Sequence, residues 1–199
     1  MVTAYHPRGS ADRLEEILKK PHLQIHNSLE TRLRLCVDYV RILEFLHNSP
    51  LGIRVMCDSN DIEKTLSQYL VTDTFNLVVA DLDALPEVNH EEGQLIKCGH
   101  RELFGSFVAP EQLWPFAPVP FNNDQMQGYD EKIDIWRIPN VIDKLLGRVK
   151  GSNFVRRQLL NIHERCKMRD PQLRPSATSV LQELYRVSAL SNSGNNEEI

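Results

Sequence analysis

Two aspartates, Asp58 and Asp81, stand at the two ends of a segment that the sequence predicts to be a β-hairpin. Asp58 lies in a polar run after a short apolar stretch, and Asp81 directly follows the second predicted strand. A hairpin returns the chain to its starting point, so we expect the two carboxylates on one face of a cleft, on the order of 10 Å apart. Two such groups suit phosphoryl transfer, in which one accepts the proton of the acceptor hydroxyl and the other holds Mg²⁺ on the nucleotide phosphates. Asp58 is the candidate base and Asp81 the candidate metal ligand, although either aspartate alone is also typical of a solvated turn.

The predicted hairpin has strands at residues 66–71 and 75–80, joined by a turn at Thr72. A long amphipathic helix is predicted before it, over residues 28–47. Its apolar residues recur at helical spacing: Leu29, Leu33, Val37, Val40 and Leu43. The loop that carries Asp58 follows this helix through a short connector.

Four further helices are predicted, over residues 11–20, 131–146, 153–167 and 176–190. Residues 84–130 show little periodicity and contain five prolines and four glycines, and a loop of this length is usually functional or disordered. Residues 2–5 have the character of a strand end, and the polar tail over residues 191–199 is expected to be disordered. The sequence thus predicts one mainly helical α+β domain over residues 1–190.

The composition excludes several partner classes. The chain has 199 residues, a net charge of −4 and no apolar run of the roughly 20 residues that span a bilayer. No nucleic acid or anionic membrane is therefore expected as a partner, and no secretory signal follows Met1, so the chain as written is expected to stay where it is made. The four cysteines are too widely spaced for a zinc site. Four buried thiols are the simplest interpretation, and one or two disulfides fit an oxidising compartment.

Three later motifs follow the two aspartates in a fixed order. Ala109-Pro-Glu111 closes the long loop, Asp134-Ile-Trp136 lies in the next predicted helix, and Arg174 precedes the last one. This order resembles the large, C-terminal lobe of a protein kinase, with the predicted hairpin at its catalytic loop.

The resemblance is closer to the protein O-mannose kinase family. It is carried by Met56-Cys-Asp-Ser-Asn-Asp61, by Asp81-Leu-Asp-Ala-Leu-Pro86, and by Lys97-Cys-Gly-His-Arg101 ahead of Phe107-Val-Ala-Pro-Glu111. It covers about residues 1–188.

This resemblance implies an ATP- and Mg²⁺-dependent kinase. Its acceptor would be the 6-hydroxyl of mannose, in a trisaccharide on dystroglycan-type glycoproteins. The family is anchored in the endoplasmic reticulum membrane with the kinase domain in the lumen. The anchor and the small lobe are expected before Val2, so this chain is expected to be a fragment with little activity alone.

The resemblance also implies individual roles. Asp58 corresponds to the catalytic aspartate and Asp81 to the Mg²⁺ ligand, while the backbone of Ala4 and His6 would bind adenine. Two further contacts are implied, a buried ion pair between Glu111 and Arg174, and a brace from Asp134 to the catalytic loop.

Some positions depart from the kinase pattern. Cys57 replaces the usual arginine, so activation-loop phosphorylation is not expected as a switch. The second metal ligand is either Glu63 or Gln68. The departures leave two alternative functions, a Ser/Thr or Tyr protein kinase and a pseudokinase scaffold. Residues 84–107 and 112–130 are expected to wall the glycan site.

Aromatic side chains in and beside these walls have two interpretations. Trp114, Phe116 and Tyr129 either stack on sugar rings or belong to the core.

Overall fold

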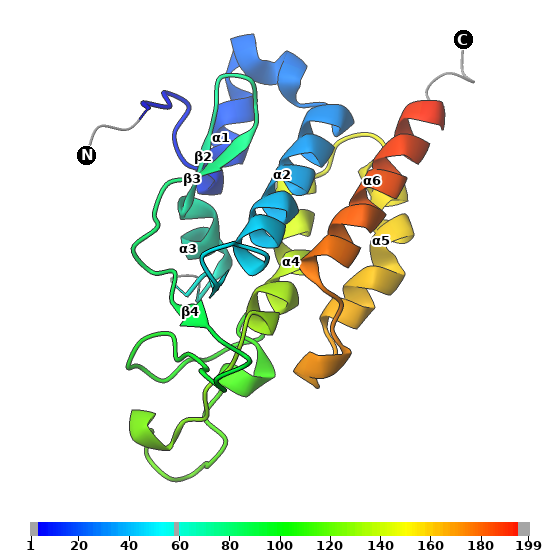
Figure 1. Ribbon diagram of the computed structural model, residues 1–199. Coiled ribbons are helices and arrows are strands. Elements are labelled where there is room, and N and C mark those ends of the chain that lie inside the picture. The colour runs from blue at the N-terminus through cyan, green and yellow to red at the C-terminus, as the bar shows by residue number, and fades with distance from the viewer. Residues whose placement is uncertain (1–3, 58–59, 195–199) are drawn as a thin grey trace.

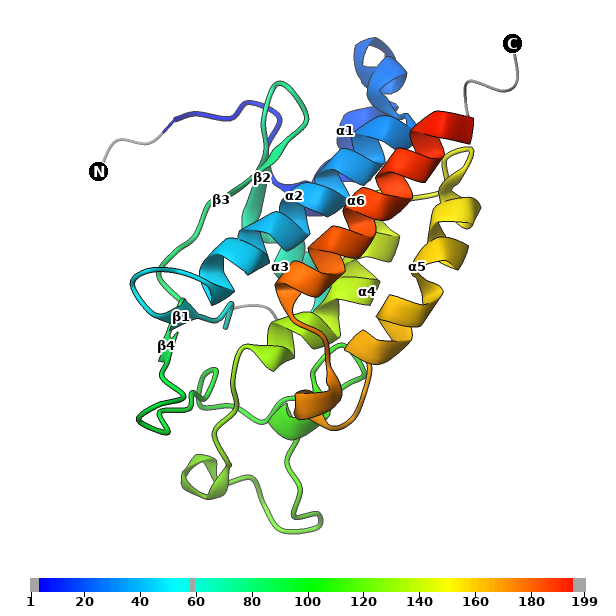
Figure 2. The same cartoon turned by 45° about the vertical axis from the view of Figure 1, so that its right-hand side comes forward.

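A computed structural model describes residues 4–57 and 60–194 of the chain. Four long helices pack side by side, and two small antiparallel sheets lie along one flank (Figures 1 and 2). The long helices are α2 (Leu29–His47), α4 (Lys132–Leu146), α5 (Ser152–Cys166) and α6 (Ala177–Gly194). The short helices are α1 (Leu14–Lys19) and α3 (Ile62–Ser67), and 3₁₀ turns cover Ala11–Arg13, Pro21–His26, Pro110–Gln112, Asn123–Gln125 and Pro171–Leu173. The prediction of a mainly helical α+β domain is confirmed in this coarse form.

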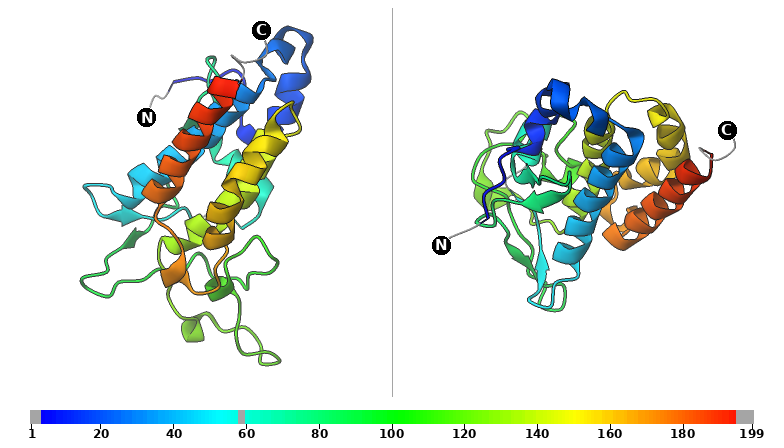
Figure 3. Two further views of the ribbon diagram at one scale, coloured as in Figure 1. Left: turned by 90° about the vertical axis from the view of Figure 1, so that its right-hand side faces the viewer. Right: turned by 90° about the horizontal axis from the view of Figure 1, so that it is seen from above.

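Helix α2 lies at the centre of the helix packing, between α4 and α6. Figure 3 shows the helices from two further sides. It begins where Ser28 Oγ accepts the backbone N–H of Thr31 (3.3 Å), which is a typical N-cap. Its apolar face is fully buried at Leu35 and Val40. The buried Arg32 extends from α2 to donate to the carbonyl of Leu145 in α4 (3.0 Å), so one side chain joins both helices.

The predicted hairpin exists, with shorter strands than expected. β2 (Tyr69–Val71) pairs antiparallel with β3 (Leu77–Val79), and Tyr69 lies opposite Val79. Residues 66 and 67, predicted as strand, are instead the last turn of α3. Asp61 Oδ1 accepts the N–H of Lys64 (2.7 Å) and so caps a helix there. Phe75 also lies outside its predicted strand, because its φ of +57° belongs to the turn.

A second ladder, between β1 (Ile53–Arg54) and β4 (Glu87–Val88), lies within segments where no strand pairing was predicted. Ile53 pairs with Val88 and Arg54 with Glu87. Around it is a separate small core of buried side chains. These are Val55, Cys57, Val88, Ile96, Cys98, Ala109, Tyr129 and Ile133.

Two terminal expectations need correction. Helix α6 continues to Gly194, so the predicted disorder from residue 191 is wrong for residues 191–194, and residues 195–199 lie outside the described part. Ser191 Oγ donates to the carbonyl of Val187 (2.9 Å), which satisfies its hydroxyl within the helix. Of the predicted strand at residues 2–5, only 4 and 5 are described, and they form no strand. Within the described residues, no helix has the length and apolar character to cross a bilayer.

His163 in α5 makes the stability of the fold pH-dependent. Its Nε2 is enclosed without a hydrogen-bond partner, and burial lowers its pKa to about 4 from the ordinary 6.5. Between pH 6.5 and 4, the imidazole of His163 is protonated in the unfolded chain and largely neutral in the folded chain. Protonation therefore favours the unfolded state, and the free energy of unfolding should fall by about 2–3 kcal/mol as the pH is lowered from 6.5 to 4. Urea denaturation across this window should show a smaller fall in His163→Gln. The exposed His22→Gln serves as control, and an unchanged pH dependence in His163→Gln would contradict this assignment.

Candidate functional site

The backbone that leads into position 58 is fixed by helix α4. Asp58 and Ser59 themselves lie outside the described residues. Met56 donates its backbone N–H to Asp134 Oδ2 (3.0 Å), and its carbonyl accepts from Arg137 Nη1 (2.8 Å). The predicted brace from Asp134 is therefore confirmed, and it holds the chain just before the candidate base.

Two further side chains contact Asp134, and a third contacts one of these two. His47 Nε2 lies 3.1 Å from Asp134 Oδ2, and Arg137 Nη1 lies 3.1 Å from Oδ1. Gln112 Oε1 accepts from Arg137 Nη2 (3.2 Å). Such pairing is what permits charges to be buried here. Sequence reasoning missed His47, Arg137 and Gln112, although the i,i+3 spacing of Asp134 and Arg137 placed both on one helix face.

The β1–β4 ladder brings the two halves of the candidate site to one end. Beyond the paired strands, Cys57 donates its backbone N–H to the carbonyl of Ala84 (3.1 Å) in the same register. Asp81 stands three residues before Ala84, so at most about 10 Å of backbone separates it from the ladder end at which the chain continues into position 58. Asp81 is partly buried, and its Oδ1 accepts the N–H of Asp83 (3.1 Å).

A disulfide bond joins Cys57 to Cys98 in the long loop. The interpretation of four buried thiols is wrong for this pair and holds for Cys36 and Cys166, which are buried and free. Burial raises the pKa of both free thiols to about 12, so they are unreactive at neutral pH. The sequence had left one or two disulfides open as an alternative to four free thiols, and this bond is one such disulfide. Sequence spacing could not pair the cysteines, because 41 positions separate them.

The segment with Ala4 and His6 leads into a contact with the β2–β3 hairpin. Its end is fixed where the carbonyl of Gly9 accepts the N–H of Val71 in β2 (2.9 Å). Ala4 is exposed, and the carbonyl of His6 accepts the N–H of Gly9 (3.1 Å) in a turn. The chain just after the candidate adenine-binding segment is therefore bonded to β2, whose partner strand β3 leads to Asp81.

The two candidates for the second metal ligand lie in different surroundings. Glu63 is on the exposed side of α3, with its Oε1 3.6 Å from Lys144 Nζ. Gln68 is buried, and its carbonyl accepts the N–H of Ala80 (2.8 Å), the residue directly before Asp81. The structure thus places Gln68, and not Glu63, beside the strand end that carries Asp81.

The predicted ion pair between Glu111 and Arg174 is present and bidentate. Arg174 Nη1 and Nη2 lie 2.5 and 2.8 Å from the two carboxylate oxygens of Glu111. The Arg174 side chain is 0% exposed and that of Glu111 17%. The pair joins the turn that closes the long loop to the start of α6.

Comparison with known proteins gives one consistent result. Protein O-mannose kinase of Homo sapiens is 55% identical over 188 residues, which is 94% of this chain and 54% of the human protein. Those of Gallus gallus and Xenopus laevis are 54% and 53% identical over 191 residues, with 96% of this chain and 54% of each relative covered. This chain is a homologue of protein O-mannose kinases. It spans about half the length of the curated relatives it matches. No protein-family model matches the chain.

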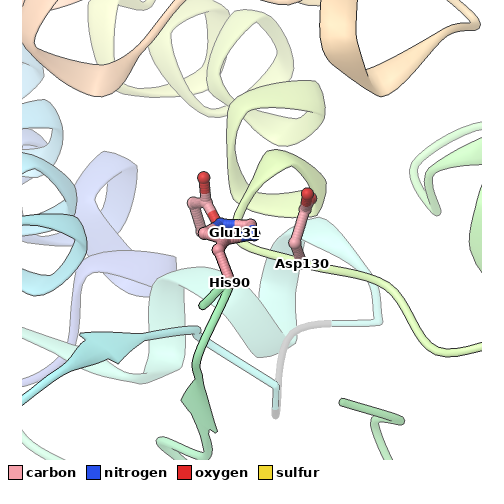
Figure 4. A group of neighbouring side chains, drawn as sticks. All are labelled: His90, Asp130 and Glu131. Atoms are coloured by element: carbon pink, nitrogen blue, oxygen red, sulfur yellow. The ribbon is translucent and has the colours of Figure 1, made fainter. Parts of the chain in front are cut away.

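In this homologue of O-mannose kinases, a second group of ligand-type side chains was not foreseen from the sequence. His90, Asp130 and Glu131 have ligand atoms within 4.8 Å of one another (Figure 4). Each has an ordinary role: Glu131 Oε2 pairs with His90 Nε2 (3.0 Å), and Asp130 Oδ1 accepts the N–H of Lys132 at the start of α4. Burial raises the pKa of the Asp130 carboxyl. This group stabilises the entry to α4.

The three aromatic candidates for sugar stacking separate into two settings. Tyr129 is core: it is buried, and its hydroxyl accepts the N–H of Cys98 (2.5 Å). Trp114 and Phe116 form an edge-to-face pair with ring centroids 5.0 Å apart, and Phe116 is exposed. The structure therefore leaves Trp114 and Phe116 as aromatic surface and removes Tyr129 from the stacking candidates.

Proposed function

We propose that the protein transfers the γ-phosphate of ATP to the 6-hydroxyl of an O-linked mannose, within a trisaccharide on a dystroglycan-type glycoprotein. In this proposal the chain is the C-terminal lobe of a kinase-like fold. The observation that carries it is the β1–β4 ladder, whose register sets Asp81 and the chain entering position 58 at the same end. The identity to protein O-mannose kinases supports the choice of acceptor.

Asp58 would act on the acceptor. A carboxylate there accepts a hydrogen bond from the sugar hydroxyl and takes its proton as the oxygen bonds to phosphorus. The brace from Asp134 and Arg137 to Met56 supports this role, because it fixes the backbone on which Asp58 is carried.

The residues around Asp81 fit Mg²⁺, which prefers oxygen ligands. Asp81 belongs to no ion pair among residues 4–57 and 60–194, and the hydrogen bond that it accepts there goes to Oδ1, from the N–H of Asp83. Gln68 Oε1 accepts from no donor within that same part, so Asp81 Oδ2 and Gln68 Oε1 are available to a cation. Asp81 would be the principal ligand and Gln68 the second. When bound, the ion would neutralise charge on the nucleotide phosphates. The backbone of Ala4 and His6 would hold adenine.

The proposal includes an oxidising compartment, the lumen of the endoplasmic reticulum. The Cys57–Cys98 disulfide supports it, because such bonds persist in oxidising compartments and are rare in the cytosol.

Asp81→Asn tests the proposed function in the natural protein that carries this sequence. Loss of the metal carboxylate should weaken MgATP binding by ~100-fold, and phosphate transfer to a mannose-containing glycan with it. Calorimetry with MgATP and transfer of radiolabelled phosphate measure the two effects.

Asp83→Asn is the matched control for this test. It removes the same charge two residues away and keeps the backbone N–H that Asp81 accepts. Unchanged MgATP affinity in Asp81→Asn, or equal losses in both variants, would contradict the role of Asp81.

A further inference from the structure

The long loop turns back on itself to reach Cys57, the residue before the candidate base in the sequence. After β4 the chain reverses, where Asn89 and Gln94 exchange backbone hydrogen bonds of 3.0 and 2.8 Å. It then returns, with Ile96 bridged to Tyr129 (3.0 Å in both directions), and Cys98 meets Cys57. The loop therefore leaves the ladder at one end and rejoins it at the end next to position 58.

The junction at Cys98 is firmly held. The disulfide is buried in the small core around β1 and β4, and the N–H of Cys98 donates to the Tyr129 hydroxyl. Beyond it, residues 99–107 form no helix or strand, and Phe104 is 70% exposed. Among the described residues, two hydrogen bonds hold this segment: His100 Nδ1 lies 3.4 Å from Asn123 Nδ2, and the carbonyl of Ser106 accepts from Trp136 Nε1 (3.2 Å). The disulfide is thus the covalent anchor from which this irregular segment extends.

The start of that segment lines a small cavity whose walls are partly polar and partly apolar. Gly99 and Arg101 line it together with Gln112 and Tyr129, and its volume of about 10 Å³ has room for one water molecule or hydroxyl. Gln112 is buried, and its Nε2 has no acceptor among the described residues. A buried donor without an acceptor is unfavourable, and the oxygen of a water molecule or hydroxyl in this cavity would satisfy it.

We propose that the Cys57–Cys98 disulfide positions residues 99–107 as the wall that receives the phosphate acceptor. This inference rests on the proposed function. The bond joins the residue directly before Asp58 to the residue directly before the segment. It should therefore hold the distance between the proposed base and the proposed wall constant. The segment proposed to bind the nucleotide is attached elsewhere, because the chain that follows Ala4 and His6 is bonded to the β2–β3 hairpin through the carbonyl of Gly9 and the N–H of Val71. The disulfide should therefore act on the acceptor and not on ATP.

Cys98→Ser in the natural protein tests this role. We expect kcat/KM for the glycan to fall on the order of 10²-fold, as displacement by about 1 Å can cost that much, with the KM for MgATP unchanged. Amide hydrogen exchange over residues 96–107 should accelerate. Cys166→Ala, which removes a buried free thiol, should change neither readout.

Reduction of the folded wild-type protein gives a second, mutation-free test. A phosphine reduces the disulfide to the two thiols of Cys57 and Cys98 and is itself oxidised to the phosphine oxide, with the oxygen coming from water. The treated wild-type protein should then show the same glycan kinetics and hydrogen exchange as Cys98→Ser. The Cys98→Ser variant itself should not respond to the phosphine. Unchanged exchange over residues 96–107, or an equal loss of ATP and glycan parameters, would overturn the proposal. Absence of glycan kinase activity in the wild-type protein would instead refute the proposed function. That result is seen in the wild-type assay alone, so it is not confused with a failure of this proposal.

Discussion

Under the proposed function, Asp58→Asn in the natural protein that carries this sequence is expected to abolish phosphate transfer to the glycan while the fold and MgATP binding survive. Asparagine keeps the shape of the side chain and removes the carboxylate that accepts the proton. Loss of a general base of this kind typically costs 10²–10⁴-fold, so we expect kcat to fall on the order of 10³-fold. MgATP affinity should be preserved, because the metal is assigned to Asp81. Steady-state kinetics with the glycan and calorimetry with MgATP separate the two roles.

Asp61→Asn is the matched control for this experiment. It neutralises a carboxylate in the same polar loop, and asparagine caps a helix as well as aspartate, so the bond to the N–H of Lys64 can be kept. Its kinetics should resemble those of the wild type. If Asp58→Asn retains most of its turnover, the base is another residue. If it loses ATP affinity as Asp81→Asn does, the roles of the two aspartates have been exchanged.

The elements that the sequence predicted best are those with long periodic patterns. The predicted helix over residues 28–47 matches α2 within one residue, because its buried face repeats over five turns and Ser28 caps its start. The short elements were harder. Leu66 belongs to α3 and not to the predicted strand, since a cap at Asp61 outweighed the strand preference of the apolar residues after it. Two-residue strands such as β1 show no periodicity at all.

The candidate site was predictable where its residues carry motifs. Glu111, Arg174 and Asp134 were expected in roles that the contacts confirm. The Cys57–Cys98 bond and the long-range role of Arg137 were not, because both depend on the path of a loop without pattern. Where the chain is irregular, tertiary contacts decide its course, and neighbouring residues in the sequence say little about them.

Glu111→Ala is expected to destabilise the protein strongly. All five N–H donors of Arg174 are used: two bind Glu111, and the others bind backbone carbonyls of Lys132, Met168 and Arg169. Removing the carboxylate leaves a guanidinium that is 0% exposed without its counter-charge. Breaking such a pair from one side typically costs ~3–5 kcal/mol of unfolding free energy.

Glu16→Ala provides the contrast that makes this result specific. Glu16 pairs with Arg13 at 2.9 Å, but both side chains are about two-thirds exposed, at 66% and 67%. Exposed pairs contribute roughly 0–1 kcal/mol, so this variant should unfold almost as the wild type does. Urea denaturation of both variants at pH 7 measures the difference. Equal midpoints for Glu111→Ala and wild type would mean that the turn at Pro110–Gln112 is held to α6 by the apolar contacts around it, and that the ion pair adds nothing measurable.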